Sequence, residues 1–410
     1  MQTPPRTASA AKEFRDTRIF LVLLVGLLGI QPATSDIYLA ALPSITQALH
    51  TSPAIATWTL SAMVGTFGIS QLFIGPLADR FGRRPVLLFG MALYCIANLA
   101  ATFAPTIYAL IALRMLQGVG VACAFVCGRG LIRDLFAPEA GARVMARAFS
   151  FMAFVPLCGP FLGGVLDATL GWWGPFALLA SCGAALWLLI LKQLPETNQH
   201  KNPAATQIAP LLRNYLVIAR NPVFACYTAA TISSYAGLFA FLSGSSFVMI
   251  KVFGLSRPMY GVWFGIATSG YLIGTLLCRR SIAAHGVAAT VRLGGIVSLC
   301  SGTIMAALAL SGVHNVYALL LPQWGYMIAH GLIQPCGQAG CIAPFPTMAG
   351  AASALNGALQ MGMAMAVGAW IGASFNNTPV PLALTVFTAS IFVALSSVLA
   401  VPKFGQLARE

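Results

Sequence analysis

Twelve long apolar stretches follow one another along this chain of 410 residues. A helix needs roughly 20 mostly apolar residues to cross the hydrocarbon core of a bilayer. Hydrophobic residues make up 58% of the sequence and charged residues only 8%, and a soluble domain has no way to keep that much apolar surface from water. The sequence therefore predicts an all-α, polytopic membrane protein. The expected spans are residues 19–43, 54–76, 86–104, 107–131, 144–168, 173–193, 222–247, 258–278, 291–311, 315–340, 350–374 and 380–401.

A polar segment at residues 194–221 divides the chain almost in half. Six predicted spans precede it and six follow it, which is the arrangement of membrane proteins built from two parallel repeats. We therefore expect an N-terminal six-helix bundle at residues 1–193, a cytoplasmic linker at 194–221 and a C-terminal six-helix bundle at 222–410.

Basic residues gather on one side of the predicted spans, which accounts for the net charge of +14 without a nucleic-acid partner. The opposite side holds only Lys251 and Arg257. Because cytoplasmic loops of membrane proteins are enriched in lysine and arginine, we expect both termini in the cytoplasm. The residues assigned to that side are Arg6, Lys12, Arg15, Arg18, Arg80, Arg83, Arg84, Arg133, Arg143, Arg147, Lys192, Lys201, Arg213, Arg220, Arg279, Arg280, Arg292, Lys403 and Arg409.

No pattern in the sequence predicts an enzyme, a metal site or a channel. The ten cysteines include no C-x-x-C pair, and several lie within apolar stretches, as small buried side chains do. A membrane enzyme needs a convergent catalytic set such as paired acids or H-E-x-x-H, and a channel needs a filter-like segment; neither is found. We expect no enzymatic activity, no metal and no cofactor.

Asp36 and Arg114 lie well inside predicted spans of the first half, and Arg129 is the other arginine that falls inside a span. Each costs roughly 2.5–3.5 kcal/mol to insert at the centre of a membrane helix. Asp36 and Arg114 each lie about seven residues from the same membrane surface, and therefore about 10 Å deep. Desolvation favours the protonated form of a carboxylic acid and a nearby cation favours the ionised form, so the pair suits a proton-coupled switch. The alternative is a structural acid at a helix end that faces water. Asp167 lies near the end of its span, where we expect a solvated loop residue.

A polar stripe runs along the tenth predicted span, where Gln323, His330, Gln334 and Gln338 are spaced by seven, four and four residues. This spacing places them on one face of a helix. The stripe either lines a cavity, since lipid offers it no partner, or forms hydrogen bonds between helices. Asn356 and Gln360 form a similar pair on the eleventh span.

Small residues and prolines are concentrated in the fifth predicted span, at Pro156, Gly159, Pro160, Gly163 and Gly164. Small residues let helices approach closely, and proline bends a helix. The segment is therefore expected to act as a hinge.

Four sequence strings together resemble one family, the major facilitator superfamily. Residues 75–84 (GPLADRFGRR) resemble its signature between helices two and three, and residues 114–120 (RMLQGVG) its helix-four motif. Residues 159–164 (GPFLGG) are similar to the helix-five motif of antiporters. Residues 35–43 (SDIYLAALP), together with Arg133 and Asp134, resemble the bicyclomycin and chloramphenicol resistance branch.

The resemblance implies a twelve-helix major-facilitator fold and drug:proton antiport by alternating access across a bacterial inner membrane. Asp36 would be the proton-linked acid, driven by the proton gradient, and Arg114 its partner. The expected partners are a small-molecule drug, protons and membrane lipid, and the protein is expected to be a monomer. The implied latch on the cytoplasmic side, in which Asp79 can also cap a neighbouring helix, comprises Gly75, Asp79, Arg80, Gly82, Arg83, Arg84, Arg133 and Asp134. The candidate residues of the substrate cavity are Tyr38, Trp58, Gln117, Tyr235, Phe239, Trp324, His330, Gln334, Asn356 and Gln360.

The chain departs from the family pattern in ways that bear on the substrate. The corresponding loop of the second half, residues 278–286, keeps two arginines but no acid, and Val155 stands where the helix-five motif begins with glycine. The first span carries no glutamate. One acid in a mainly apolar, aromatic cavity suits neutral or weakly charged aromatic amphiphiles. Export or proton symport of a small metabolite such as a sugar or an organic acid remains the alternative.

Overall fold

The computed structural model describes residues 18–152, 154–198, 201–313 and 315–401. The predicted basic residues Arg6, Lys12, Arg15, Lys403 and Arg409 lie outside these ranges. The described residues of the first half are helical over most of their predicted spans, with turns at residues 37–38 and 102–103. Its elements are α2 (Arg18–Asp36), η1 (Leu39–Ala41), α3 (Leu42–Ala48), α4 (Pro53–Phe81), α5 (Arg83–Ala101), α6 (Ile107–Leu135), α7 (Pro138–Met152), α8 (Phe154–Thr169) and α9 (Gly174–Gln193).

The second half repeats the all-helical pattern after a linker that contains helices of its own, η2 (Pro203–Thr206) and α10 (Ile208–Ala219). Gly286 interrupts α12 with φ 82° and ψ 175°, so this element supplies two of the predicted spans. The elements of this half are α11 (Pro222–Ser246), the π-helical turn η3 (Phe247–Val252), α12 (Arg257–Leu310), α13 (Val316–Ile342), α14 (Ala349–Ser374), α15 (Val380–Ala394) and the π-helical turn η4 (Leu395–Ala400).

Side-chain caps explain where several of these helices begin. Ser52, Thr106, Asn221 and Asn315 each accept a hydrogen bond from a backbone N–H in the first turn of the helix that follows. Such caps satisfy N–H groups that have no partner within the helix. Polar residues at the ends of apolar runs thereby set the helix boundaries.

Nine helices in the described ranges are long and apolar enough to cross a membrane. One of these nine, α12, supplies two spans. Of the two spans that remain, α13 supplies one, and the consecutive helices α7 and α8 together supply the other. These segments match the twelve predicted spans in order. Both α4 and α6 continue past their apolar runs, so that Asp79 and Arg133 lie on helices and not in loops.

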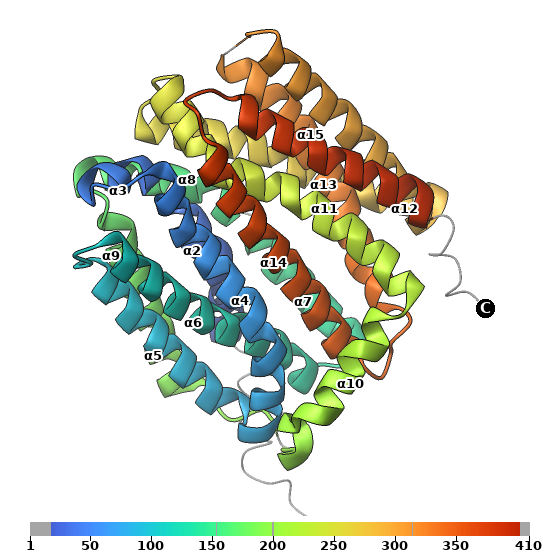
Figure 1. Cartoon of the computed structure of the whole chain (residues 1–410). Helices are drawn as coiled ribbons and strands as arrows, with labels where there is room; N and C mark the ends of the chain where they lie inside the picture. The colour runs from blue at the N-terminus through green and yellow to red at the C-terminus, as the bar shows by residue number, and fades with distance from the viewer. Residues whose placement is uncertain (1–17, 153, 199–200, 314, 402–410) are drawn as a thin grey trace, which may run out of the picture.

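The two halves lie side by side, and α14 runs beside α4 (Figure 1). Glycines make this contact close, because Gly65 and Gly68 of α4 receive Met365 and Met361 of α14. A second contact joins α8 to α12. We refer below to the end of the molecule that carries Asp79 and Arg83 as the basic end, and to the end that carries Asp167 and Arg257 as the opposite end.

Candidate functional site

Arg114 is a fully buried cation in the first half. It projects from α6 and donates hydrogen bonds to the carbonyl oxygens of Thr59 and Thr34, both at 3.2 Å, and to Oε1 of Gln117 at 2.7 Å. Its guanidinium carbon lies 4.5 Å from the centre of the Tyr38 ring, which is a cation–π contact. Because these partners come from α2, α4, α6 and the turn after α2, Arg114 ties these elements together.

Tyr38 and Gln117, expected in the substrate cavity, surround this cation instead. Both are fully buried. The Tyr38 hydroxyl is hydrogen-bonded to the hydroxyl of Thr59, and the Gln117 amide donates to the carbonyl of Ala97 at 3.5 Å. In this conformation they position Arg114 and leave no surface to an open cavity.

Asp36 ends α2, and its side chain is 4% exposed. Its Oδ1 accepts a hydrogen bond from the hydroxyl of Ser35 at 2.7 Å. The side chain lies beside Gly159 of α8, and η1, three residues further along the chain, contacts α11 and α12 of the second half. Asp36 therefore lies where the two halves meet.

Asp36 and Arg114 do not form an ion pair in this conformation. Arg114 contacts α2 at Thr34, only two residues before Asp36. The cation thus reaches the end of α2 through a backbone carbonyl and not through the Asp36 carboxylate.

The glycines of α8 form a seam between helices. A side chain at Gly163 would overlap the carbonyl oxygen of Ile37, and one at Gly164 would overlap the backbone of Arg257 in α12. Gly159 and Pro160 are buried in the same helix, and Pro156 is half-buried. These expected hinge residues therefore hold α8 in backbone contact with both α2 and α12.

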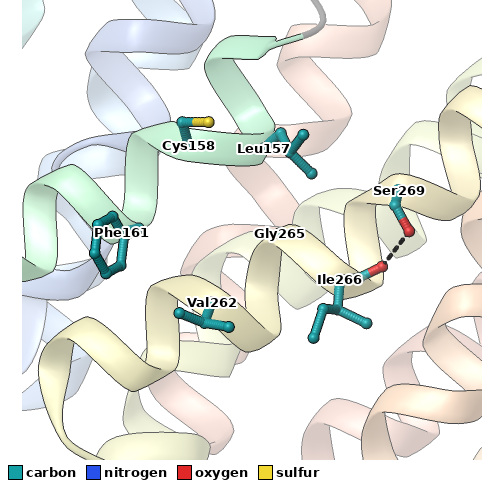
Figure 2. Close-up of a pocket in the computed structure, with 7 residues that line it drawn as sticks. All are labelled: Leu157, Cys158, Phe161, Val262, Gly265, Ile266 and Ser269. Atoms are coloured by element: carbon teal, nitrogen blue, oxygen red, sulfur yellow. Dashed lines mark hydrogen bonds between the residues drawn. The ribbon is translucent and has the colours of Figure 1, made fainter.

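A lipid-facing groove of about 370 Å³ lies on the outer side of this seam (Figure 2). Its walls come from α8 and α12, and the hydroxyl of Ser269 is turned back onto its own helix, where it donates to the carbonyl of Ile266 at 2.6 Å. The lining residues are Leu157, Cys158, Phe161, Val262, Gly265, Ile266 and Ser269. The groove is apolar and separate from Asp36, which lies on the glycine face of α8.

We expect Gly163→Val to destabilise the protein, because the added side chain forces α8 away from the Ile37 carbonyl. Overpacking of this kind costs about 1–3 kcal/mol. Thermal unfolding of the purified protein in detergent measures the effect. Gly362→Val is the matched control, since nothing lies within 4 Å of a Cβ at that helical glycine. Equal stability of the two variants would contradict the seam.

Asp167 is not the solvated loop residue that its position in the sequence suggested. It is 1% exposed within α8, and its Oδ2 lies 3.0 Å from Nε of Arg257 and accepts the Ser44 hydroxyl at 2.7 Å. Of the ion pairs between described residues, this one joins the two halves. Beside it, Lys251 donates to the hydroxyl of Thr46 at 3.1 Å. At the opposite end the two halves are therefore joined by an ion pair and a hydrogen bond.

The latch residues predicted at the basic end form one charged network. Nη2 of Arg83 lies 2.6 Å from Oδ1 of Asp79, and Nε of Arg83 lies 3.2 Å from Oδ2 of Asp134. Arg133 approaches the same oxygen of Asp79 at 3.3 Å. Because the Arg83 side chain is only 3% exposed, these acids compensate a nearly buried cation, which would otherwise be costly.

The acid that caps the next helix is Glu196 and not Asp79. Its carboxylate oxygens accept the backbone N–H groups of Arg83 at 2.9 Å and Arg84 at 3.2 Å, at the N-terminus of α5. A carboxylate is favourable there because it meets unpaired N–H groups and the positive end of the helix dipole. The turn before α5 needs glycine, since Gly82 has φ 109° and a side chain there would overlap Glu196.

The remaining latch residues attach to neighbouring segments of the basic end. Arg80 donates to the hydroxyl of Thr206 at 2.6 Å, and Arg84 donates to the carbonyl of Leu191 at 3.0 Å. Gly75 lies on α4, with Val126 of α6 at contact distance from a Cβ built there.

In the second half, His330 of α13 lies among aromatic rings. Its Nδ1 is hydrogen-bonded to the hydroxyl of Ser234 at 2.8 Å, and its ring centre lies 6.1 Å from that of Tyr235 and 5.5 Å from that of Tyr271. Tyr235 in turn stacks on Phe239 at 6.3 Å. These side chains come from α11, α12 and α13, so the aromatic group joins three helices of the second half.

Several amides of this half form hydrogen bonds between helices, which is one of the two roles considered above for the polar stripe. Gln334 donates to the carbonyl of Thr231 at 3.2 Å and to Oε1 of Gln360 at 3.4 Å. The hydroxyl of Thr231 lies 3.1 Å from Oδ1 of Asn356. These bonds connect α11, α13 and α14. Gln323 is fully buried, and both of its amide atoms are without a hydrogen bond within the described part of the chain.

Two tryptophans expected in the cavity lie elsewhere. Trp58 is 38% exposed and shares the outer face of α4 with Ile69 and Phe73, where lipid is the expected solvent. Trp324 packs against Gly270 of α12, and its indole N–H donates to Ser269 at 3.2 Å. Helical periodicity explains the position of Trp58, because spacings of eleven and four residues place it on one face of α4 with Ile69 and Phe73.

The sequence profile described as the Major Facilitator Superfamily matches residues 24–369. The chain belongs to this superfamily. The protein is therefore a membrane transporter with an all-helical major facilitator fold, and not an enzyme. The resemblance drawn from the four sequence strings is confirmed.

Relatives of this major facilitator protein include drug-resistance proteins. "Multidrug resistance protein D" of Escherichia coli (strain K12) is 30% identical over 340 residues, which cover 83% of this chain and 85% of that protein. "Bicyclomycin resistance protein homolog" of Haemophilus influenzae (strain ATCC 51907 / DSM 11121 / KW20 / Rd) is 25% identical over 371 residues, 90% of this chain and 93% of that one. Among solved structures, a D-xylose-proton symporter is similar in fold, with a TM-score of 0.66 and 18% identity over 92% of this chain and 97% of that one.

Proposed function

We propose that this major facilitator protein is a proton-coupled exporter of small amphiphilic drugs or antibiotics, working by alternating access in a bacterial inner membrane. The observation that carries the proposal is Asp36. This acid is buried where the halves meet, and its carboxylate has no cation within ion-pair distance among the described residues. A buried carboxylate without a cation is costly, whereas a carboxylic acid is not, so the group suits a site that binds and releases a proton.

In the proposed cycle, drug binding and protonation of Asp36 favour opposite conformations of the protein. Drug binding between the halves favours the form in which Asp36 releases its proton to the cytoplasm. Outward opening then releases the drug, and a proton taken from the outer side by Asp36 permits the return. Each turn of the cycle exchanges a proton entering for a drug leaving.

The arrangement of charges supports the two gates that such a cycle needs. Asp167 and Arg257 join the halves at the opposite end, and Arg129 of α6 donates to the hydroxyl of Ser353 in α14 at 2.8 Å at the basic end. With the basic end in the cytoplasm, both termini are cytoplasmic, as the distribution of lysine and arginine predicts.

The names of the relatives support drugs as the transported class. The wall formed by Tyr235, Phe239 and His330 is aromatic and uncharged apart from the imidazole, which favours flat amphiphiles over sugars. A pocket for a sugar would be expected to offer a denser set of paired polar groups.

Drug uptake into proteoliposomes with an imposed pH gradient tests the proposal. We expect accumulation of at least one uncharged aromatic antibiotic that collapses when the gradient is dissipated. A panel of sugars and organic acids is measured beside the antibiotics. Gradient-driven movement of a metabolite without movement of any drug would overturn drug export in favour of metabolite transport.

A further inference from the structure

The linker helix α10 exposes a row of large apolar side chains near the basic end. Ile208, Leu212 and Leu216 are each more than half exposed, and their spacing of four residues places them on one face of the helix. We call these three residues the apolar stripe. Another face of α10 packs on the protein, with Ile218 buried and Tyr215 half-buried. An exposed apolar row of this kind marks contact with an apolar partner.

Two hydrogen bonds show how deep in the membrane α10 lies. The segment before it starts at the end of α4, where the backbone N–H of Asn202 donates to the carbonyl of Asp79 at 3.1 Å. Further along, the Tyr215 hydroxyl donates to the carbonyl of Leu72 at 3.0 Å. Leu72 precedes Asp79 by seven residues, which is about 10 Å along a helix. Because Leu72 lies within the predicted span 54–76, α10 lies beside the end of an apolar run, where hydrocarbon gives way to headgroups.

The orientation of α10 suits a position along the membrane surface. Its axis crosses the direction of the spans (Figure 1). It is attached to both halves, because Tyr215 bonds to α4 and the helix also packs against α14. A helix that crosses the spans keeps its whole apolar stripe at one depth, so all three side chains can enter the same leaflet.

Two arginines flank the apolar stripe. At about 100° per residue, Arg220 and Arg213 lie about 40° and 60° beyond Leu216 around the helix axis. Both arginines are exposed, α10 contains no acidic residue, and no ion pair between described residues includes either of them. An apolar face with arginines at its edge is the pattern of a helix in the membrane interface, where guanidinium groups meet lipid phosphates.

We propose that α10 lies in the membrane interface at the basic end, with its apolar stripe among the acyl chains and with Arg213 and Arg220 bound to the phosphates of anionic phospholipids. The lipid supplies the negative charge that the neighbouring side chains do not, and the acyl chains cover the stripe. The linker is thereby attached to the leaflet beside both halves. This contact does not depend on which molecule is transported.

Quenching of a fluorophore at Leu212→Cys by membrane lipid tests the position of α10. The full chain, with the exposed cysteines Cys158, Cys182 and Cys300 replaced by serine, is labelled and placed in phosphatidylcholine vesicles. A small fraction of the phospholipid carries a nitroxide quencher on its acyl chain. Asn214→Cys is the matched control, because it is exposed on the same helix but lies on nearly the opposite face from Leu212. We expect quenching at Leu212→Cys to be at least about threefold stronger than at Asn214→Cys, since the stripe is buried among acyl chains.

Comparison of two quencher lipids tests the role of the arginines. Nitroxide-labelled phosphatidylglycerol, which is anionic, is compared with nitroxide-labelled phosphatidylcholine at the same mole fraction. We expect phosphatidylglycerol to quench the label at Leu212→Cys about fivefold more strongly, the preference that one arginine near an anionic surface provides. Arg213→Gln/Arg220→Gln should reduce this ratio to about one. Arg279→Gln/Arg280→Gln removes the same charge from exposed positions of α12 and should leave the ratio unchanged.

Three results would overturn the proposal. Equal quenching at Leu212→Cys and Asn214→Cys would show that the apolar stripe does not enter the leaflet. Equal quenching by the two lipids, or an unchanged ratio in Arg213→Gln/Arg220→Gln, would show that these arginines do not bind anionic phospholipid. Energy transfer between donor-labelled and acceptor-labelled copies at Leu212→Cys, without quenching by lipid, would show that a second copy of the chain covers the stripe.

Discussion

Asp36→Asn is expected to abolish drug accumulation driven by a pH gradient while leaving drug binding within about threefold of wild type. The amide has nearly the shape of the carboxyl group and can still bond to the Ser35 hydroxyl, but it cannot carry a proton. Without coupling to the proton gradient the drug can only equilibrate across the membrane, so the ratio of its concentrations on the two sides should fall to about one. Transport in proteoliposomes with an imposed gradient measures this, and equilibrium binding on the same preparation shows that the protein is folded.

Ser35→Ala is the control for this variant. It removes the hydrogen-bond donor to Asp36 but keeps the acid, so gradient-driven accumulation should persist. A gradient-driven accumulation in Asp36→Asn equal to that of wild type would show that another group carries the proton.

Asp167→Asn is expected to shift the protein towards conformations that are open at the opposite end. The substitution removes the negative charge that compensates Arg257. The acid is buried but the Arg257 side chain is 37% exposed, so water screens the unpaired cation and breaking the pair costs about 1–2 kcal/mol. Because the pair joins α8 to α12, the cost falls on the closed form. A shift of about 1–2 kcal/mol changes the ratio of closed to open forms by about 5- to 30-fold.

Distances between spin labels at Gln47→Cys and Ser256→Cys measure this shift, because both positions are exposed at the opposite end, on different halves. The exposed cysteines Cys158, Cys182 and Cys300 are first replaced by serine. We expect a longer distance to dominate in Asp167→Asn and a short one in the parent. Lys251→Gln removes a neighbouring cation that bonds Thr46 without an ion pair, and it should leave the distances unchanged. Identical distributions in Asp167→Asn and the parent would show that the pair does not hold this end closed.

Apolar runs and the family strings predict the fold because lipid offers no hydrogen bonds to the backbone of a span. An α-helix forms all of these hydrogen bonds within the span itself. The ion pairs at the basic end were predictable for the same reason, since Asp79, Arg83, Arg133 and Asp134 lie at the ends of consecutive helices. Glu196 was missed because it follows Arg83 by more than a hundred residues, and no local spacing connects the two. Its position directly after the sixth span, at the same membrane surface as α5, is the signal that could have found it.

The structure places Trp58 and Asp167 differently from the expectation, each for a physical reason. Asp36 and Arg114 were matched by depth alone, and their pairing stays a prediction, since no ion pair joins them in this conformation. Helical periodicity with Ile69 and Phe73 would have placed Trp58 on the outer face of α4. Asp167 seemed solvated because its partner, Arg257, lies in the other half of the chain.

Proton release on drug addition is the most direct test of coupling through Asp36. Wild-type protein in weakly buffered detergent solution, monitored with a pH indicator, should release protons when a transported drug is added, and Asp36→Asn should release none at equal drug occupancy. Drug binding to the wild-type protein without proton release, or release of the same size from Asp36→Asn, would contradict the central claim.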